Sequence, residues 1–236
     1  MIVHPVDPDR FLVELSDLRG PLPERARRHQ HALYSVVGWA HQYLAKPHPD
    51  LGRKGPVCPF VPGTLDKGLL YLALQPGRPR SATEVTDALA HYRAWYLELR
   101  GQAGPAAQFL TLLVLFPDLP LEDATRLVDD TQSRLKAEYV AQGLMIGEFH
   151  DGPPPKPGLW NPDFRPLRSP VPLLAIRSLV PTDFPFLRDD RDFVAAYLDR
   201  VAPDDVPPRW RDEVAEVAAD FGLVPAPPAL EDASIG

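Results

Sequence analysis

The sequence contains very little cysteine. Cys58 is the single cysteine among 236 residues, which excludes an intrachain disulfide framework and a zinc site built from four cysteines. Long apolar runs are also missing, since no stretch approaches the ~18 consecutive apolar residues of a membrane-spanning helix. The N-terminal segment lacks the basic region and apolar run of a secretory signal. From these absences we expect a reduced, cytoplasmic protein with no membrane partner.

A surplus of basic residues is absent as well. Lysine and arginine together number 25 against 32 acidic residues, which gives a formal net charge of -7. Nucleic-acid binding draws on positive charge that displaces counterions from phosphates, so we expect no nucleic-acid partner. The sequence also lacks a phosphate-binding glycine loop, a nucleophile elbow, a zincin motif and a kinase signature. A small-molecule substrate remains as the expected partner, and the oligomeric state stays open.

Proline, by contrast, is abundant. The chain has 30 prolines, more than twice the usual ~5%, and proline limits regular structure because it lacks a backbone N–H and fixes φ. Hydrophobic residues make up 44% of the chain, which is enough for an ordinary core. We therefore predict a single domain over residues 1–224 with prominent loops, and a frayed C-terminal tail over residues 225–236.

Hydrophobic periodicity predicts alternating strands and helices after a first helix over residues 28–45. Short apolar runs bounded by turn residues predict strands at 68–74, 109–116, 144–150 and 171–179. Helical spacing predicts helices at 81–101, 121–143, 189–201 and 207–221. The expected fold is α+β or α/β, with a small sheet of about four strands flanked by helices and with long proline-rich loops at 46–68 and 151–170. Long loops inside compact domains are often functional.

The residues that could carry chemistry lie where these loops meet strands. His48 and Cys58 belong to the first long loop, and Cys58 precedes Pro59, so its thiol could face an iron atom or another electrophile. A lone cysteine is more often a small buried hydrophobe, and His48 between two prolines could simply brace the loop. We expect Cys58 to be reduced and at least partly buried.

Glu148 and His150 lie two residues apart on a predicted strand, so their side chains leave the same face. The carboxylate could orient the imidazole, and an imidazole at a strand end suits either an axial haem ligand or a general base. A surface histidine beside Asp151 needs no function, and this alternative stays open. Binding of a non-haem metal is disfavoured because the spacing matches no standard ligand set.

Three arginines surround the last predicted strand. Arg165, Arg168 and Arg177 could receive a carboxylate or a haem propionate through their fork-shaped donors. We further predict that residues 46–66 and 148–170 lie against each other and line the largest pocket, because both are long loops at strand ends of one small sheet.

Several segments resemble known families. HPDLGRKGPVCPFVPGTLDKGLLYLAL, MIGEFH and SPVPLLAIRSLVPTDFPFL resemble an actinobacterial family of unknown function with an HPDLGRxGxVCPF signature, often met near natural-product genes. The CPFVPG turn and the elements after it are distantly similar to the YqcI/YcgG family, which includes haem-dependent enzymes that oxygenate nitrogen. That resemblance implies a haem pocket between the sheet and its loops. The family's histidine after the last strand has no counterpart in IRSLVPTDF, so His150 is the iron ligand chosen from the residues alone.

Three functions follow as hypotheses. The first is a haem-dependent, monooxygenase-like oxidoreductase, an oxygenase or oxidase that acts on a small nitrogen-containing metabolite in natural-product biosynthesis. In it His150 binds the metal, and Cys58, His48, Arg165, Arg168 and Arg177 contribute to the cofactor site. The second is a non-redox enzyme with His150 and Glu148 as catalytic acid-base pair. The third is a ligand-binding accessory protein without chemistry.

Overall fold

The computed structural model describes residues 1–79, 81–156 and 160–223. The chain divides into two compact units. The sheet unit comprises Met1–Lys136 and Met145–Ser178, and the helical unit comprises Ala137–Leu144 and the chain from Leu179 onward. The single domain over residues 1–224 stays a prediction. The predicted frayed tail at 225–236 lies outside the described residues.

A six-stranded sheet forms the centre of the sheet unit. The strands, in spatial order, are β1 (Ile2–Val3), β2 (Phe11–Glu14), β3 (Leu70–Leu74), β4 (Thr111–Leu115), β6 (Leu173–Ser178) and β5 (Leu144–Phe149). Strands β3 and β4 are parallel, whereas the pairs β1–β2, β2–β3 and β4–β6 are antiparallel. The mixed α/β class and all four predicted strands are confirmed. The expected number of about four strands was too low, because β1 and β2 were missed.

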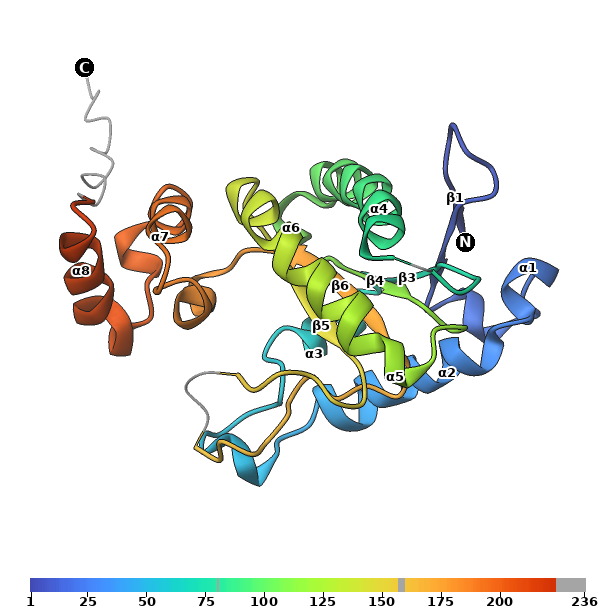
Figure 1. Ribbon diagram of the computed structural model, residues 1–236, viewed down its shortest axis with the longest axis horizontal. Helices are drawn as coiled ribbons and strands as arrows, with labels where there is room; N and C mark the ends of the chain where they lie inside the picture. Colours follow the sequence, from blue (N-terminus) through green and yellow to red (C-terminus); the bar gives the residue numbers. More distant parts are fainter. Residues whose placement is uncertain (80, 157–159, 224–236) are drawn as a thin grey trace, which may run out of the picture. The chain divides into compact units, whose positions relative to one another are not determined.

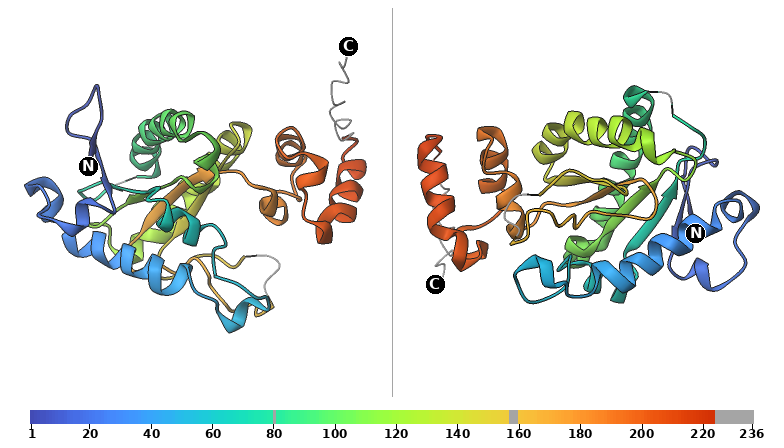
Figure 2. Two further views of the ribbon diagram at one scale, coloured as in Figure 1. Left: turned by 180° about the vertical axis from the view of Figure 1, so that it is seen from behind. Right: turned by 60° about the horizontal axis from the view of Figure 1, so that its bottom comes forward.

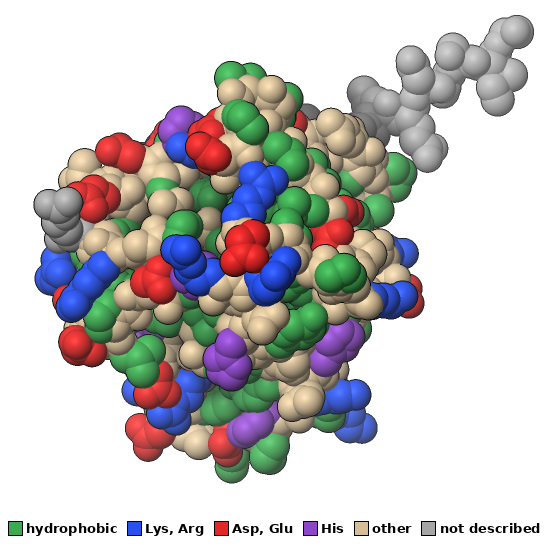
Figure 3. Space-filling view, turned by 90° about the vertical axis from the view of Figure 1, so that its right-hand side faces the viewer, with side chains coloured by type: hydrophobic (Ala, Val, Ile, Leu, Met, Phe, Trp, Pro, Cys, Tyr) green, Lys and Arg blue, Asp and Glu red, His purple; other side chains and the backbone are tan. Residues whose placement is uncertain are grey.

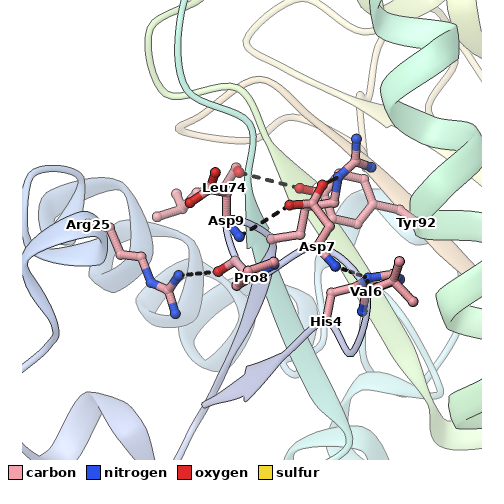
Figure 4. Close-up of polar contacts among 9 residues, drawn as sticks. His4, Val6, Asp7, Pro8, Asp9, Arg25, Leu74 and Tyr92 are labelled. Atoms are coloured by element: carbon pink, nitrogen blue, oxygen red, sulfur yellow. Dashed lines mark hydrogen bonds and ion pairs between the residues drawn. The ribbon is translucent and has the colours of Figure 1, made fainter.

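The two missed strands are short, and contacts outside the strands hold them in place. Figure 4 shows the turn between them. The His4 Nδ1 atom accepts the backbone N–H groups of Val6 and Asp7, and the Arg25 guanidinium donates to the carbonyl of Pro8 at 2.5 Å. The His4 ring also packs edge-on against Trp95, with centroids 4.9 Å apart. Strands of two and four residues give too short an alternation for a sequence pattern to reveal.

Helices cover both faces of this sheet. On one side run α1 (Glu24–Arg27), α2 (Gln30–Trp39) and the π-helical turn Ala40–Leu44; α4 (Ala82–Ala103) and the helix that follows β4 lie on the other (Figures 1 and 2). That second helix comprises α5 (Leu121–Ala124), a π-helical segment (Thr125–Asp129) and α6 (Asp130–Ala141). Apolar residues from the sheet and from these helices are buried, so the core lies on both faces.

The predicted loop at 46–68 contains a helix that the sequence did not reveal. Helix α3 spans Val61–Asp66, and a 3-10 turn spans Pro49–Leu51. The second residue of α3 is Pro62, whose fixed φ suits the first helical turn. The Thr64 hydroxyl lies 3.1 Å from the Phe60 carbonyl and 2.7 Å from the Phe109 carbonyl, so it ties α3 to a segment 45 residues away. This tertiary contact stabilises a helix too short to be stable alone.

The helical unit contains α7 (Arg191–Leu198) and α8 (Arg211–Asp220), which confirms the two predicted C-terminal helices. The Asp190 carboxylate caps α7 by accepting the backbone N–H groups of Asp192 and Phe193 at 2.9 and 3.0 Å. No helix in the described part of the chain combines the length and the hydropathy of a membrane span.

Acidic and basic side chains are interspersed over the face of the molecule drawn in Figure 3, without a broad area of one charge.

Candidate functional site

A cavity of about 590 Å³ lies in the sheet unit. One wall comes from the segment Trp39–Asp50, and the other comes from Asp151 together with residues 161–170. The structure thus confirms that the first and second predicted loops meet at a pocket. This cavity is larger than a second cavity of about 250 Å³, which lies between the helices of the helical unit.

A glycine allows the two walls to approach each other. Gly52 follows the Pro49–Leu51 turn with φ +64°, in the left-handed region that glycine adopts without strain. A Cβ atom placed on Gly52 would lie 2.2 Å from the Cβ of Trp160, so no other residue fits there without movement. The Arg53 guanidinium then donates to the carbonyls of Pro56 and Val57, each at 3.0 Å. These contacts fix the loop that carries His48 and Asp50.

Aromatic rings form a continuous row along the cavity. The Trp39 ring contacts Phe149 edge-on at 5.6 Å and lies nearly parallel to Tyr43 at 6.3 Å between centroids. The Tyr43 ring meets the edge of His48, and His48 stacks on Phe164 at 4.4 Å with an interplanar angle of 17°. Of these five rings, all except Phe149 line the cavity. The faces of such rings carry partial negative charge, which attracts cations.

The Tyr43 hydroxyl adds a polar group to this aromatic wall. Burial raises the pKa of Tyr43 to about 12, an effect that the nearby Arg168 guanidinium partly opposes. The phenol is therefore neutral at physiological pH and can donate a hydrogen bond. Among the described residues, the Tyr43 hydroxyl has no hydrogen-bond partner. This hydroxyl is therefore available to a ligand.

Charged side chains of both signs line the same cavity: Asp50, Asp151, Asp163, Arg165 and Arg168. Asp151 accepts from Nε of Arg168 at 2.7 Å. Arg165 donates to the backbone carbonyls of Pro162 and Phe164. Within the described part of the chain, neither Asp50 nor Asp163 has a lysine or arginine at ion-pair distance; Asp50 lies 3.7 Å from Nδ1 of His48. In the described part of the chain, Asp163 therefore has no basic partner, and Asp50 has only the imidazole of His48.

His150 lies elsewhere, in a buried cluster behind this cavity. Only 2% of the residue is exposed, which overturns the surface alternative, and His150 is not among the lining residues. Its Nε2 atom lies 2.9 Å from Oδ1 of Asp129, and its Nδ1 atom accepts the backbone N–H of Gly152 at 3.1 Å. Because Nδ1 accepts, the ring proton of the neutral imidazole is on Nε2 and points to Asp129. Both ring nitrogens are occupied.

Glu148 does not orient His150 as the sequence suggested. Its Oε1 atom pairs with the ammonium of Lys156, and its Oε2 atom is buried without a hydrogen-bond partner. Asp129, which orients the imidazole instead, comes from the π-helical segment before α6. Burial raises the pKa of Asp129, Glu148 adds to the rise, and the hydrogen bond with His150 opposes it. No sequence signal marks Asp129, because it lies 21 residues from His150 on a helix.

The remaining predicted residues separate into two groups. His48, Arg165 and Arg168 line the cavity. Cys58 is half-buried against the core, as predicted, and does not line the cavity. Arg177 donates to the carbonyl of Ser178, and it too lies outside the cavity lining.

The residues present do not fit a haem iron in this arrangement. Iron needs a free imidazole lone pair, but Nδ1 of His48 accepts the N–H of Asp50 at 3.3 Å, which places the proton of the neutral ring on Nε2. The same holds for His150. Among the described residues, no group of three or more His, Cys, Asp or Glu side chains is placed to hold a metal ion.

Comparison with known proteins gives one match. Residues 33–213 match the model of a family described as a domain of unknown function, DUF6875. The chain belongs to this family. No curated protein and no solved structure matched. The DUF6875 segment includes the cavity walls, and it also includes Asp129 and His150 of the buried cluster.

Proposed function

We propose that this protein binds a small, positively charged nitrogen compound in the cavity of the sheet unit. The supporting observation is the combination of an aromatic row with two carboxylates, Asp50 and Asp163, that have no lysine or arginine at ion-pair distance in the described part of the chain. A cation gains from the faces of aromatic rings and from nearby carboxylates together. The volume of about 590 Å³ lies within the roughly 300–1,000 Å³ typical of small-molecule sites.

The two kinds of contact contribute differently. Asp163 is exposed and Asp50 is 37% exposed at its side chain, so solvent weakens the attraction of each carboxylate for a cation. The rings exclude water from part of the ligand, where cation–π contacts contribute about 0.5–2 kcal/mol. We therefore expect the aromatic wall to supply most of the affinity and the carboxylates to supply selectivity for positive charge.

Pairs of isosteres test this proposal by calorimetry. Choline is compared with its neutral carbon analogue 3,3-dimethylbutan-1-ol, and methylguanidinium is compared with methylurea. In at least one pair the cation should bind about tenfold more tightly, which corresponds to about 1.4 kcal/mol. Equal affinity within both pairs, or no binding of either cation, contradicts the proposal.

Two variants locate the binding. Phe164→Leu removes one ring face and keeps an apolar side chain, and it should weaken cation binding about threefold to tenfold. Asp163→Asn should narrow the difference between cation and neutral isostere. The matched control is Asp87→Asn, an exposed carboxylate on α4 outside the cavity lining, which should leave both affinities unchanged.

Haem-dependent oxygenation of such a nitrogen compound, in natural-product biosynthesis, stays a second candidate. It is favoured by one observation, that His48, Arg165 and Arg168 all line the cavity. For His48 to bind iron, its Nδ1 atom would have to release the N–H of Asp50. The absorption spectrum after addition of haemin tests this: a Soret band that moves in His48→Ala supports haem binding, whereas the spectrum of free haemin contradicts it.

The alternative of a His150–Glu148 acid-base pair receives less support. The structure gives each residue a different partner, and both are buried away from the cavity. A general base must reach the proton that it abstracts. A purely binding role is compatible with the same cavity, and the calorimetric comparison applies to it unchanged.

A further inference from the structure

We infer that His150 is a positioning residue for the cavity: in its neutral form with the proton on Nε2, it holds the turn that carries Asp151, and protonation of Nδ1 releases that turn. The link to ligand affinity rests on the proposed function. The geometric part, the coupling of His150 to Asp151 and Arg168, does not need a ligand.

The side chain of His150 is fixed at both ring nitrogens. Nε2–H donates to Asp129, and Nδ1 accepts the N–H of Gly152. The second bond closes a short turn over His150, Asp151 and Gly152. The middle residue of that turn is Asp151, so the imidazole holds a residue that lines the cavity although it does not line the cavity itself.

The backbone of His150 is tied to the opposite wall. His150 and Arg168 form an isolated β-bridge, and the carbonyl of His150 accepts the N–H of Ser169 at 3.0 Å. The Asp151 carboxylate in turn binds Nε of Arg168 at 2.7 Å. The turn and the Arg168 segment thus share a backbone bridge and an ion pair, and movement of the turn changes where the Arg168 guanidinium lies.

The charged groups around His150 set the sign of the effect. Asp129 faces Nε2 of the imidazole. Glu148, two residues earlier in the chain, pairs with Lys156 from the following loop. The pair of Asp151 and Arg168 lies beyond the turn. The Asp129 carboxylate can accept from Nε2–H in either protonation state of the imidazole. Once protonated, however, Nδ1 carries a hydrogen and can no longer accept from Gly152. Lowering the pH therefore loosens the turn while the pair with Asp129 remains.

The conservative variants separate these two bonds. His150→Asn places an oxygen near the position of Nδ1, so it can accept from Gly152 but does not titrate. His150→Gln places an amide nitrogen near the position of Nε2, so it keeps the donor to Asp129 and loses the Gly152 bond. His41→Gln, in the exposed part of the Ala40–Leu44 turn, is the control.

Nitrogen NMR of the full chain tests the geometric part without a ligand. We expect the Nε2–H tautomer of His150 at neutral pH, and we expect the Gly152 amide and the Arg168 Nε–H signals to titrate with the same midpoint as the His150 ring. In His150→Asn this titration of the two signals should disappear. An Nδ1–H tautomer, or Gly152 and Arg168 signals that ignore the His150 midpoint, overturns the inference.

The pH profile of choline affinity tests the link to binding. We expect affinity to fall as the pH drops through the His150 midpoint in the unaltered protein and in His41→Gln. His150→Asn should give a flat profile, and His150→Gln should bind about fivefold more weakly at high pH. Identical profiles in all four proteins overturn the link. If choline does not bind at all, the proposed function fails, and the NMR titration still decides the role of His150.

Discussion

The two sites of ionisable residues at the end of β5 differ in almost every property. The buried cluster of Asp129, Glu148, His150 and Lys156 has its side chains paired within the protein, apart from one oxygen of Glu148. The cavity has aromatic rings and two carboxylates, Asp50 and Asp163, that have no lysine or arginine at ion-pair distance among the described residues. Side-chain exposure is 2–3% for His150 and Glu148 but 58% for Asp151, the next residue along.

This contrast shows that a residue can be next to a cavity-lining loop in the sequence without lining the cavity itself. The two-residue period of β5 sends Glu148 and His150 toward the α5–α6 helix, while Phe149 between them packs against Trp39 on the other side. Paired and buried groups stabilise a conformation, whereas unpaired groups in a cavity are free to bind. We therefore propose that the buried cluster contributes to stability and positioning, and that the cavity binds the ligand.

The largest expected effect is on stability and comes from breaking the buried pair. Lys156→Met leaves the Glu148 carboxylate buried and without a partner, and should lower the free energy of unfolding by about 3 kcal/mol in urea denaturation. Adding Glu148→Gln should restore most of the loss. Lys54→Met, at an exposed lysine, is the control. An equal, small change in Lys156→Met and Lys54→Met would mean that the cluster does not carry the stability assigned to it.

A somewhat smaller effect is expected at the contact between the cavity walls. Gly52→Ala forces a Cβ against Trp160 and a left-handed backbone on alanine, so it should destabilise the fold by about 1–3 kcal/mol. Trp160→Ala alone shortens the side chain but keeps the Cβ, and Trp160→Gly removes the clashing atom. The combination of Gly52→Ala with Trp160→Gly should therefore recover the steric part of the loss. Wild-type stability in Gly52→Ala would contradict the close approach of the walls.

The smallest effect concerns pH. Because the folded state raises the pKa of Asp129 above its ordinary value of 3.8, the contribution of this group to stability is greatest below that value and is lost as pH rises through the raised pKa. Asp129→Asn keeps an oxygen acceptor for His150 and does not ionise. Its stability relative to the unaltered protein should therefore improve between pH 3 and pH 7. A relative stability that worsens over this range contradicts the sign.

Much of the fold could be predicted from the sequence, and less of the site. Apolar runs such as Leu70–Leu74 and Thr111–Leu115 identify buried strands, because burial on both faces leaves a continuous hydrophobic segment. Helix α4 starts directly after Ser81, whose hydroxyl accepts the Glu84 N–H, and the sequence predicts its start to within one residue. Strands β1 and β2 and helix α3 were missed because tertiary contacts, and not local pattern, stabilise them.

The site depended on contacts that local sequence patterns do not reveal. The proline-rich loops were predicted to line the pocket, and residues of both loops do so. His48, Arg165 and Arg168, which were predicted as cofactor-site residues, line the cavity, and their cofactor role stays a prediction. The pairing of His150 with Asp129 depends on how the helix that carries Asp129 packs on the sheet, and the sequence pattern does not predict that packing. Trp39 and Tyr43 follow the helical spacing that is typical of core residues. The sequence pattern therefore does not distinguish these two cavity-lining residues from residues of the core.

The most direct test of the central claim is an amide chemical-shift map of the protein titrated with choline, compared with 3,3-dimethylbutan-1-ol at equal concentrations. The account predicts shifts for choline concentrated at residues 39–50 and 161–170, together with Asp151, and much smaller shifts for the neutral analogue. Shifts of equal size for both compounds, or choline shifts centred on α7 and α8, would contradict the claim that this cavity recognises a cation.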